Sequence, residues 1–342
     1  MKNRVVVTGL GMLGDFGIGK EDFFRFVDGK KEKHKTSDFN FEEYIDTALL
    51  RRADQVSYFA SVAARFALKD ANLLDTIGLE SGGVNTHRLG VIVGTVHGAL
   101  QHTIDYHKGL VLGNPTTVSP SLFSNSVINS VISCITSIFK IYGYAATIPG
   151  YAGVHQAAKL AAEFIREGEL ESCLIGGVDI NNNFLVEAYS SCMDDSTRIS
   201  KNFGGSGFLI LESLNSALKR RSNIYGEVLG VGIVTADYKR VQKHKLSPLK
   251  AFDLQGIECV FASSFYDKDS RMRADLFLKD IPQKKTAIID CNNLFGCTFS
   301  AAESFQIILG ICRLSESCKK VLVNYTSQAN SNAGLLAGKY YR

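Results

Sequence analysis

The chain lacks the features that divide a protein into tethered domains or carry it into a membrane. Only five of its 342 residues are proline, and no stretch rich in proline, glycine and serine interrupts it, so we expect one compact unit. No uncharged apolar run reaches about 18 residues, and no apolar signal region precedes the strand-like segment Arg4 to Thr8. These absences predict a soluble, cytoplasmic protein without a membrane span.

An excess of charge of either sign is also absent. The chain has 38 Lys and Arg residues against 34 Asp and Glu residues, a formal net charge of +4, which is too balanced to indicate nucleic-acid binding. The exception is a cluster formed by Lys30, Lys31, Lys33 and Lys35. Two interpretations stay open for this cluster, a solvated helix end or loop and a patch for an acidic partner such as a carrier protein.

The sequence has no C-x-x-C pair, so it has no recognisable zinc or redox motif. Most of its cysteines fall in apolar runs, which is typical of reduced, buried thiols in a cytosolic protein rather than of a disulfide framework. The eight cysteines are Cys134, Cys173, Cys192, Cys259, Cys291, Cys297, Cys312 and Cys318.

Short apolar segments alternate with amphipathic ones along the chain, and 45% of the residues are hydrophobic, enough for one large core or two fused cores. The alternation predicts an α/β layered fold. Two successive series of elements predict two halves, residues 1–212 and 213–342, packed as one compact unit. The clearest predicted helices are Asp54 to Ala71, Ser121 to Phe139, Val154 to Arg166 and Ala301 to Leu314, each with apolar residues at three- and four-residue spacing.

A literal GxGxxG motif, formed by Gly9, Gly11 and Gly14, follows the first predicted strand, as a dinucleotide-binding fingerprint would. However, further loop residues separate the third glycine from the amphipathic run Glu21 to Val27, so no helix N-terminus is presented to a pyrophosphate. No second strand ending in Asp or Glu appears about 20 residues later. The motif therefore does not predict nicotinamide or flavin binding, and we expect no cofactor.

Several segments, in order, resemble the β-ketoacyl synthase family. RVVVTGLGMLG resembles the family's opening strand and structural glycine-rich turn, LGVIVGT a later strand, and GELESCLIGGVD the strand after the nucleophile helix; GGSGFLILE and VLVNYTSQANSNAGLL continue the series. The resemblance spans nearly the whole chain. It implies a thiolase-like fold of two fused βαβ-type halves with α/β/α/β/α layering.

The departures from this family fall at its chemistry. In TIPGYAGVHQAA, residues 147–158, Gly150 stands where the family has its nucleophilic cysteine. CVFASS aligns with the family's first histidine motif and has Ser263 in place of the histidine. GCTFSAAE aligns with the second histidine motif and has Cys297 there, and Asn292 stands in place of the family's lysine. The terminal GFGG loop is replaced by residues 327–330. Since every catalytic group is replaced, the resemblance implies a chain without ketosynthase chemistry of its own.

Other residues could in principle carry relocated chemistry. His155 lies on the predicted helix rather than on its turn, and the resemblance gives it a structural role. His97, His102 and His107 are spaced by five residues, which is poor for a shared helical metal face, so a surface loop or interface is favoured over a metal site. Cys297 is most simply a small buried side chain, because no base is visible beside it.

The retained fold and lost chemistry resemble the chain-length factor of type II polyketide systems, a noncatalytic partner of an active ketosynthase. This implies a heterodimer that takes acyl groups from an acyl carrier protein, with Leu122 and Ser126 in the interface or tunnel wall. The chain is also short between Asp179 and Lys201 and between Thr235 and Phe261, where the family carries cap segments. Two alternatives stay open: a noncatalytic homodimer that binds acyl chains or regulates a pathway, and a condensing or acyl-transfer enzyme with a relocated nucleophile.

Overall fold

The structure, a computed structural model, describes residues 3–30, 39–77, 84–190, 204–235, 252, 254–265, 267–279, 281, 286–296, 298–327 and 331–341. The strands and helices in this part of the chain are, in order, β1 (Val5–Gly14), β2 (Gly17–Ile18), α1 (Gly19–Val27), α2 (Gln55–Asp70), β3 (Leu89–Thr95), α3 (Leu100–Leu112), α4 (Pro120–Ser126), α5 (Ser130–Phe139), β4 (Ala145–Pro149), α6 (Gly153–Glu167), β5 (Ser172–Asp179), α7 (Asn183–Ser190), β6 (Gly205–Ser213), α8 (Leu214–Lys219), β7 (Gly226–Thr235), β8 (Cys259–Ser264), α9 (Lys268–Lys279), β9 (Ala287–Asp290), α10 (Asn292–Phe295), α11 (Phe299–Arg313), β10 (Lys320–Thr326) and β11 (Ser331–Gly338).

These strands form one mixed sheet in the order β4-β3-β5-β6-β1-β7-β11-β10-β8-β9, with β2 paired to β1. The sheet repeats itself on the two sides of the β1–β7 pair. On each side the three outer strands are parallel, β4-β3-β5 and β9-β8-β10, and the inner pairings are antiparallel. The repeat confirms the predicted mixed α/β fold built from two similar series.

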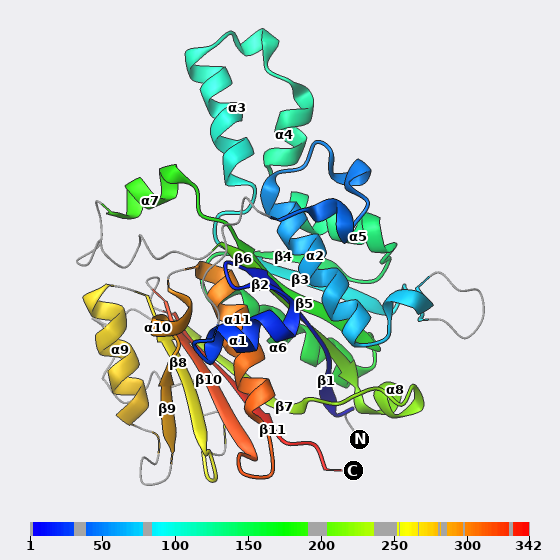
Figure 1. Cartoon of the computed structure of the whole chain (residues 1–342), viewed down its shortest axis with the longest axis vertical. Helices are drawn as coiled ribbons and strands as arrows, with labels where there is room; N and C mark the ends of the chain where they lie inside the picture. Colours follow the sequence, from blue (N-terminus) through cyan, green and yellow to red (C-terminus); the bar gives the residue numbers. More distant parts are fainter. Residues whose placement is uncertain are drawn as a thin grey trace.

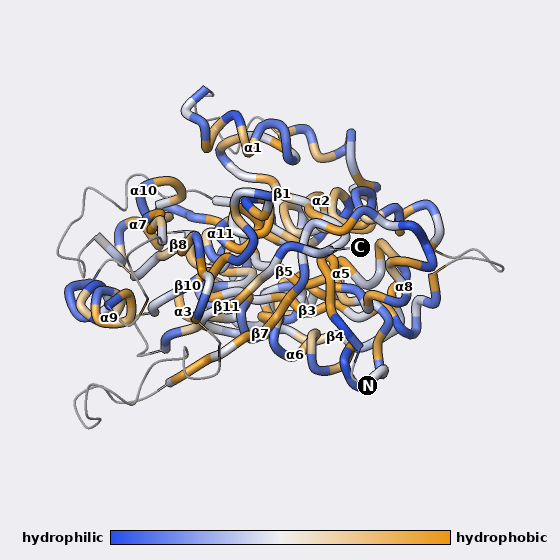
Figure 2. Tube along the Cα trace, turned by 90° about the horizontal axis from the view of Figure 1, so that it is seen from below, coloured by the Kyte–Doolittle hydropathy of each residue, from blue (hydrophilic) through white to orange (hydrophobic). Residues whose placement is uncertain are grey.

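Helices lie between the two halves of the sheet, which meet at the β1–β7 pair, and helices also cover the outer face of each half (Figure 1). α6 and α11 lie in the middle, where both contact strands on each side of the β1–β7 pair. α2 and α5 cover the outer face of the first side, and α9 covers that of the second. The result is the predicted α/β/α/β/α layering, with apolar residues concentrated in its central strands and helices (Figure 2).

The central position of α11 explains why this helix is buried nearly all round. It buries 12 of its 15 residues, because strands lie against two of its faces. The strands β3 and β5 are likewise buried at every position, as expected for parallel strands covered by helices on both faces. This burial accounts for their continuous apolar runs, which lack the alternation of a half-exposed strand.

The glycine motif near the N-terminus lies inside a strand, so the expectation of a glycine-rich turn is wrong. β1 runs through Gly9, Gly11 and Gly14, all of them buried, and α2 crosses it closely. A Cβ atom on Gly9 would lie 2.3 Å from the carbonyl oxygen of Ala67, and one on Gly11 would lie 2.0 Å from that of Ala63. The glycines therefore allow a helix backbone to approach a strand, and they leave no space for a phosphate.

We expect Gly11→Ala to unfold the chain or to destabilise it by at least about 3 kcal/mol, because the methyl group would overlap backbone that cannot move aside. The measurement is the urea midpoint of unfolding. Gly334→Ala is the matched control, since its added Cβ would meet only side-chain atoms at 3.4 and 3.5 Å, an ordinary contact. Equal midpoints for the two variants would contradict this packing role.

The predicted single helix from Ser121 to Phe139 is wrong. The structure has two helices there, α4 and α5, bent by 90° at residues 127–129. Val127 is extended, and hydroxyls in α4 bond back to the helix backbone, as Ser126 Oγ does to the Phe123 carbonyl oxygen at 2.8 Å. Such side chains compete with helical hydrogen bonds, and a β-branched residue does not favour continuing the helix.

α3 and α4 form an arm that projects from the layered body (Figure 1). Neither helix has a buried residue. The arm therefore exposes large apolar side chains, of which Leu112 is 81% exposed and Phe123 is 53% exposed. Beside the arm's base, β4 is an edge strand that pairs only with β3 among the described strands. No single described helix is long and apolar enough to cross a membrane, although the bent pair of α4 and α5 passes that test jointly by length and composition.

Candidate functional site

Gly150 lies in the turn between β4 and α6, which confirms the predicted strand-to-helix turn. Its N–H donates to the Thr95 carbonyl oxygen at 2.9 Å, and its φ of +93° is a conformation that favours glycine. A Cβ atom here would meet nothing within 4 Å. The position thus has space for a side chain but presents none.

Ser263, near the carboxyl end of β8, is held by a buried glutamine. Its Oγ donates to Oε1 of Gln306 at 2.6 Å, and Nε2 of Gln306 donates to the carbonyl oxygens of Phe261 and Asn324, both at 2.7 Å. Gln306 therefore ties α11 to β8 and β10. The hydroxyl of Ser263 is used as a donor in this network, and no described residue forms a contact with it that would provide a general base.

Asn292, at the start of α10, has a similar structural role. Its Oδ1 accepts from the N–H of Ser264 at 3.2 Å, and its Nδ2 donates to the Ser264 carbonyl oxygen at 2.8 Å. Asn292 and Ser263 line one cavity of about 260 Å³, and Arg271 lines it as well. The structure thus brings two of the four replaced positions together; Cys297 lies outside the described residues, as do residues 328–330 of the replaced loop.

Aromatic residues that follow three of the replaced positions along the chain pack against one another. Tyr151 follows Gly150, Phe265 lies two residues after Ser263, and Phe299 lies two residues after Cys297. The ring centroids of Tyr151 and Phe265 are 5.5 Å apart, and those of Phe265 and Phe299 are 6.3 Å apart. Tyr189 of α7 packs on Phe299 at 5.2 Å and on Phe265 at 6.1 Å. We call these four rings the aromatic cluster.

The buried carboxylate of Asp179 holds the backbone segments beside the aromatic cluster. Asp179, at the end of β5, accepts hydrogen bonds from the N–H groups of Val96, His97 and Ser300 at 2.9 to 3.2 Å. It thereby joins the loop after β3 to the start of α11. His97 then contacts the cluster, since its Nε2 lies 3.2 Å from the hydroxyl of Tyr189 and its ring centroid lies 4.4 Å from that of Phe299.

His155 is fully buried on α6, away from the turn, as the sequence predicts. Its Nδ1 lies 2.6 Å from Oε1 of Glu303, and its backbone N–H donates to the same oxygen at 2.7 Å. Its Nε2 faces the Val323 carbonyl oxygen at 3.3 Å. Because every polar atom of the ring is engaged inside the protein, His155 joins α6, α11 and β10 and does not face a substrate.

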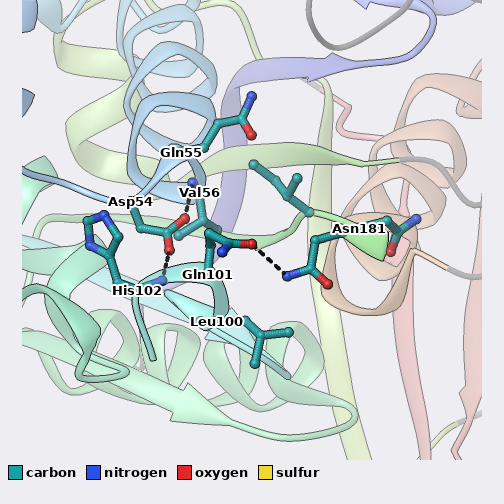
Figure 3. A pocket seen from close by; sticks show the side chains of 10 residues that line it. Asp54, Gln55, Val56, Leu100, Gln101, His102 and Asn181 are labelled. Carbon is teal, nitrogen blue, oxygen red and sulfur yellow. Dashed lines mark hydrogen bonds between the residues drawn. The ribbon is translucent and has the colours of Figure 1, made fainter. Parts of the chain in front are cut away.

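The remaining histidines of the sequence pattern separate in space. His97 lies in the loop after β3, while His102 and His107 lie on α3. Asp54 holds the base of the arm, because its carboxylate accepts the N–H of Val56 at 3.2 Å and that of His102 at 3.0 Å (Figure 3). Within the described residues no three His, Cys, Asp or Glu side chains are grouped so that they could hold a metal ion.

The described cysteines are free thiols, and burial makes them poor nucleophiles. Burial raises the pKa of the Cys312 thiol to about 12, and it raises the pKa values of Cys173 and Cys291 well above the ordinary range. Since only the thiolate reacts, these groups stay protonated and inert at neutral pH. They do not supply a relocated nucleophile.

We expect iodoacetamide at pH 8 to alkylate Cys312 about 10³-fold more slowly in the folded chain than in urea, because a pKa near 12 lowers the thiolate fraction by about that factor. The rate should rise with pH until the pH exceeds that pKa. Gly150→Cys should add one rapidly labelled thiol. Peptide mass spectrometry over time measures each site, and rapid labelling of Cys173, Cys291 or Cys312 in the folded wild-type chain would contradict this account.

Sequence reasoning missed the aromatic cluster and Asp179. The cluster had a readable signal, since an aromatic residue stands one or two positions after Gly150, Ser263 and Cys297. No sequence signal indicated the contribution of Tyr189, because α7 contacts the cluster only in the tertiary fold. Asp179 ends an apolar strand, where a lone carboxylate is usual, and only the structure shows its several N–H partners.

Comparison with known proteins defines the class. The model of the family described as "Beta-ketoacyl synthase, N-terminal domain" matches residues 2–212, and the chain therefore belongs to the β-ketoacyl synthase family. It is 26% identical over 272 residues to the 3-oxoacyl-[acyl-carrier-protein] synthase 2 of Synechocystis sp., covering 69% of this chain and 64% of that protein. It is 26% identical over 263 residues to the corresponding enzyme of Staphylococcus aureus (strain N315), covering 67% and 62%. The match thus spans less than two thirds of these relatives.

Solved structures share the thiolase-like ketosynthase fold over the whole chain. A type II polyketide ketosynthase bound to the hexaketide, in complex with its acyl-carrier protein, superposes with a TM-score of 0.82 at 23% identity and covers 99% of this chain and 100% of that one. The ishigamide ketosynthase/chain length factor gives a TM-score of 0.82 at 19% identity, with full coverage of both chains. At such identities the comparison establishes the fold.

Proposed function

We propose that this chain is a noncatalytic ketosynthase-like subunit, similar to a chain-length factor, which pairs with an active β-ketoacyl synthase and shapes its acyl or polyketide tunnel. The main support is that the resemblance aligns Gly150 with the nucleophile, Ser263 with a histidine and Asn292 with the lysine, while the polar groups of Ser263 and Asn292 form hydrogen bonds within the protein. A site organised in this way can stabilise the fold of this chain or form part of the wall of a partner's tunnel. It cannot form an acyl-enzyme.

The exposed surface around β4 and the arm supports pairing. The outer edge of β4 carries no charged residue and pairs with no other described strand, and an edge of this kind is usually covered. Phe123 is 53% exposed and Tyr144 41%, which adds apolar surface on α4 and just before β4. Leu122 and Ser126, both on α4 and both half-buried, remain the residues that we assign to the interface or tunnel wall.

Carrier-protein dependence follows from the same proposal. Substrates for the pair would be acyl and malonyl groups on an acyl carrier protein, in polyketide or fatty-acid-like synthesis in the cytoplasm. Most of the lysine cluster that we considered as an acidic-partner patch lies outside the described residues, and Lys30 is exposed beside Asp28 at 3.1 Å. We therefore place carrier-protein docking on the assembled pair and not on a particular surface of this chain.

Two other functions differ from this one in measurable ways. A relocated nucleophile would make the isolated chain form a covalent acyl adduct, for which the protonated thiols at Cys173, Cys291 and Cys312 give no support. A homodimeric acyl-binding or regulatory protein would use the same β4 edge with a second copy. The exposed edge favours neither partner by itself, so stoichiometry decides between these assemblies.

The test is reconstitution with an active β-ketoacyl synthase from the same organism. The ketosynthase, acyl carrier protein and malonyl groups are incubated with and without this chain, and products are separated by length. We expect a defined product length only when this chain is present. An unchanged length distribution in its absence would contradict the proposal.

A further inference from the structure

One buried carboxylate connects the body of the protein to the base of the arm. Asp54 is only 6% exposed and directly precedes α2, where the N–H of Val56 donates to its Oδ1 at 3.2 Å. Its Oδ2 accepts from the N–H of His102, in the first turn of α3, at 3.0 Å (Figure 3). Asp54 therefore caps two helices at once, one in the body and one in the arm.

The first turn of α3 depends on this carboxylate more than α2 does. The residue before α3 is Ala99, which has no side-chain acceptor, and α3 has no buried residue that would hold it by packing. In contrast, α2 buries 10 of its 16 residues. Both helix N-termini carry partial positive charge, so a carboxylate between them is favourable. Removal of one acceptor oxygen should therefore loosen α3 and leave α2 in place.

The next residue of α3 extends this connection to α4. Oγ1 of Thr103 donates to the carbonyl oxygens of Ala99 and Ser126, both at 2.9 Å. One hydroxyl is thus shared between the start of α3 and the last residue of α4, which is the residue that we assign to the tunnel wall. Hydrogen bonds therefore run from Asp54 to the turn of α3 that holds Ser126.

We propose that Asp54, acting through Thr103, positions the end of α4 and thereby sets the length of the products that the pair makes. Both are positioning residues, because neither side chain belongs to the assigned tunnel wall. The arm projects from the body (Figure 1), so a change at its base moves α4 relative to the rest of the chain. The effect on products rests on the proposed pairing with a ketosynthase, whereas the effect on the arm is a property of the free chain.

Hydrogen–deuterium exchange of the free chain tests the positioning step. Asparagine caps a helix as well as aspartate does, but its side chain has one acceptor oxygen and one donor group, so Asp54→Asn cannot accept from both N–H groups. We expect the amides of α3 to exchange at least about tenfold faster than in the wild-type chain, and those of α2 to be unchanged. Equal exchange of α3 in the two proteins would overturn the proposal.

Product analysis of the reconstituted pair tests the consequence for product length. Thr103→Val replaces only a hydroxyl by a methyl group, so it breaks the connection to Ser126 without changing a charge. We expect Asp54→Asn and Thr103→Val each to broaden the distribution of product lengths while the pair still assembles. The double variant should broaden it no more than the stronger single variant does, because both substitutions act on one connection. Additive effects would show two separate defects and would overturn the proposal.

Asp46→Asn is the matched control. Asp46 also caps a helical turn, through the N–H of Ala48 at 3.0 Å, but it is exposed on the body, so its substitution should change neither the exchange of α3 nor the products. Unchanged product lengths in Asp54→Asn and Thr103→Val would overturn the role in product length, provided that the wild-type pair defines a length. A wild-type chain that defines no length would instead refute the proposed function, and exchange in the free chain would then decide the positioning role alone.

Discussion

Neither the wild-type chain nor its Gly150→Cys variant should condense acyl and malonyl groups on an acyl carrier protein. The turn has space for the cysteine, since a Cβ atom at Gly150 meets nothing within 4 Å, although the φ of +93° strains a residue other than glycine. However, Ser263 and Cys297, which stand in place of the family's two histidines, provide no such pair of donors for a thioester carbonyl, and the loss of one donor already costs about 10²–10³-fold in rate. We expect both proteins to be at least about 10³-fold below an active ketosynthase.

Mass spectrometry of carrier-bound products measures this activity, with the active ketosynthase as the positive control. Iodoacetamide labelling of Gly150→Cys shows independently that the new thiol is present and accessible. Turnover by the wild-type chain alone would contradict the account. Turnover only in Gly150→Cys would show that the remaining site is competent and that one substitution inactivates it.

Substitutions on α4 should have the second largest effects, on assembly and on product length. Leu122→Asp should weaken association with the ketosynthase at least about 100-fold, because a buried unpaired charge costs roughly 3 kcal/mol. Ser126→Phe should leave assembly intact and shorten the products by filling the tunnel end. Pull-down titration measures the first effect, and product analysis of the reconstituted pair measures the second.

Both effects have matched controls. Leu49→Asp introduces the same charge at a residue that is 60% exposed on the body, and it should not change affinity. Ser124→Phe adds the same ring at an exposed position of α4, and it should not change product length. Unchanged product lengths in both Ser126→Phe and Leu122→Ala would show that α4 is not a tunnel wall, even if the heterodimer forms.

Periodicity predicted the alternating strands and helices because periodicity and burial act locally, whereas the α/β/α/β/α layering was implied by the resemblance to the family. Continuous apolar runs such as β3 and β5 follow from helices on both faces of a sheet, and the apolar spacing of α2 marks a helix that packs on one. The same reasoning failed at residues 127–129, where hydroxyls and a β-branched residue break the helix that hydrophobic spacing alone would continue. The glycine-rich turn that the resemblance implied is also wrong, because Gly11 lies inside β1, where it allows α2 to approach the strand closely.

The site was predictable only as a set of replacements. The resemblance predicts that Gly150, Ser263 and Asn292 replace the family's catalytic groups, which stays a prediction, and the structure adds which contacts these residues make. The partnership of Ser263 with Gln306 joins residues 43 positions apart, and Tyr189 reaches Phe265 across 76 positions through α7. Contacts at such separations depend on the tertiary fold, and no local pattern encodes them.

Native mass spectrometry of the chain co-expressed with an active β-ketoacyl synthase from the same organism, purified through a tag on this chain alone, tests the central claim most directly. The account predicts a 1:1 complex whose mass is the sum of this 37.4 kDa chain and one ketosynthase subunit. A stable homodimer of this chain that excludes the ketosynthase would contradict it.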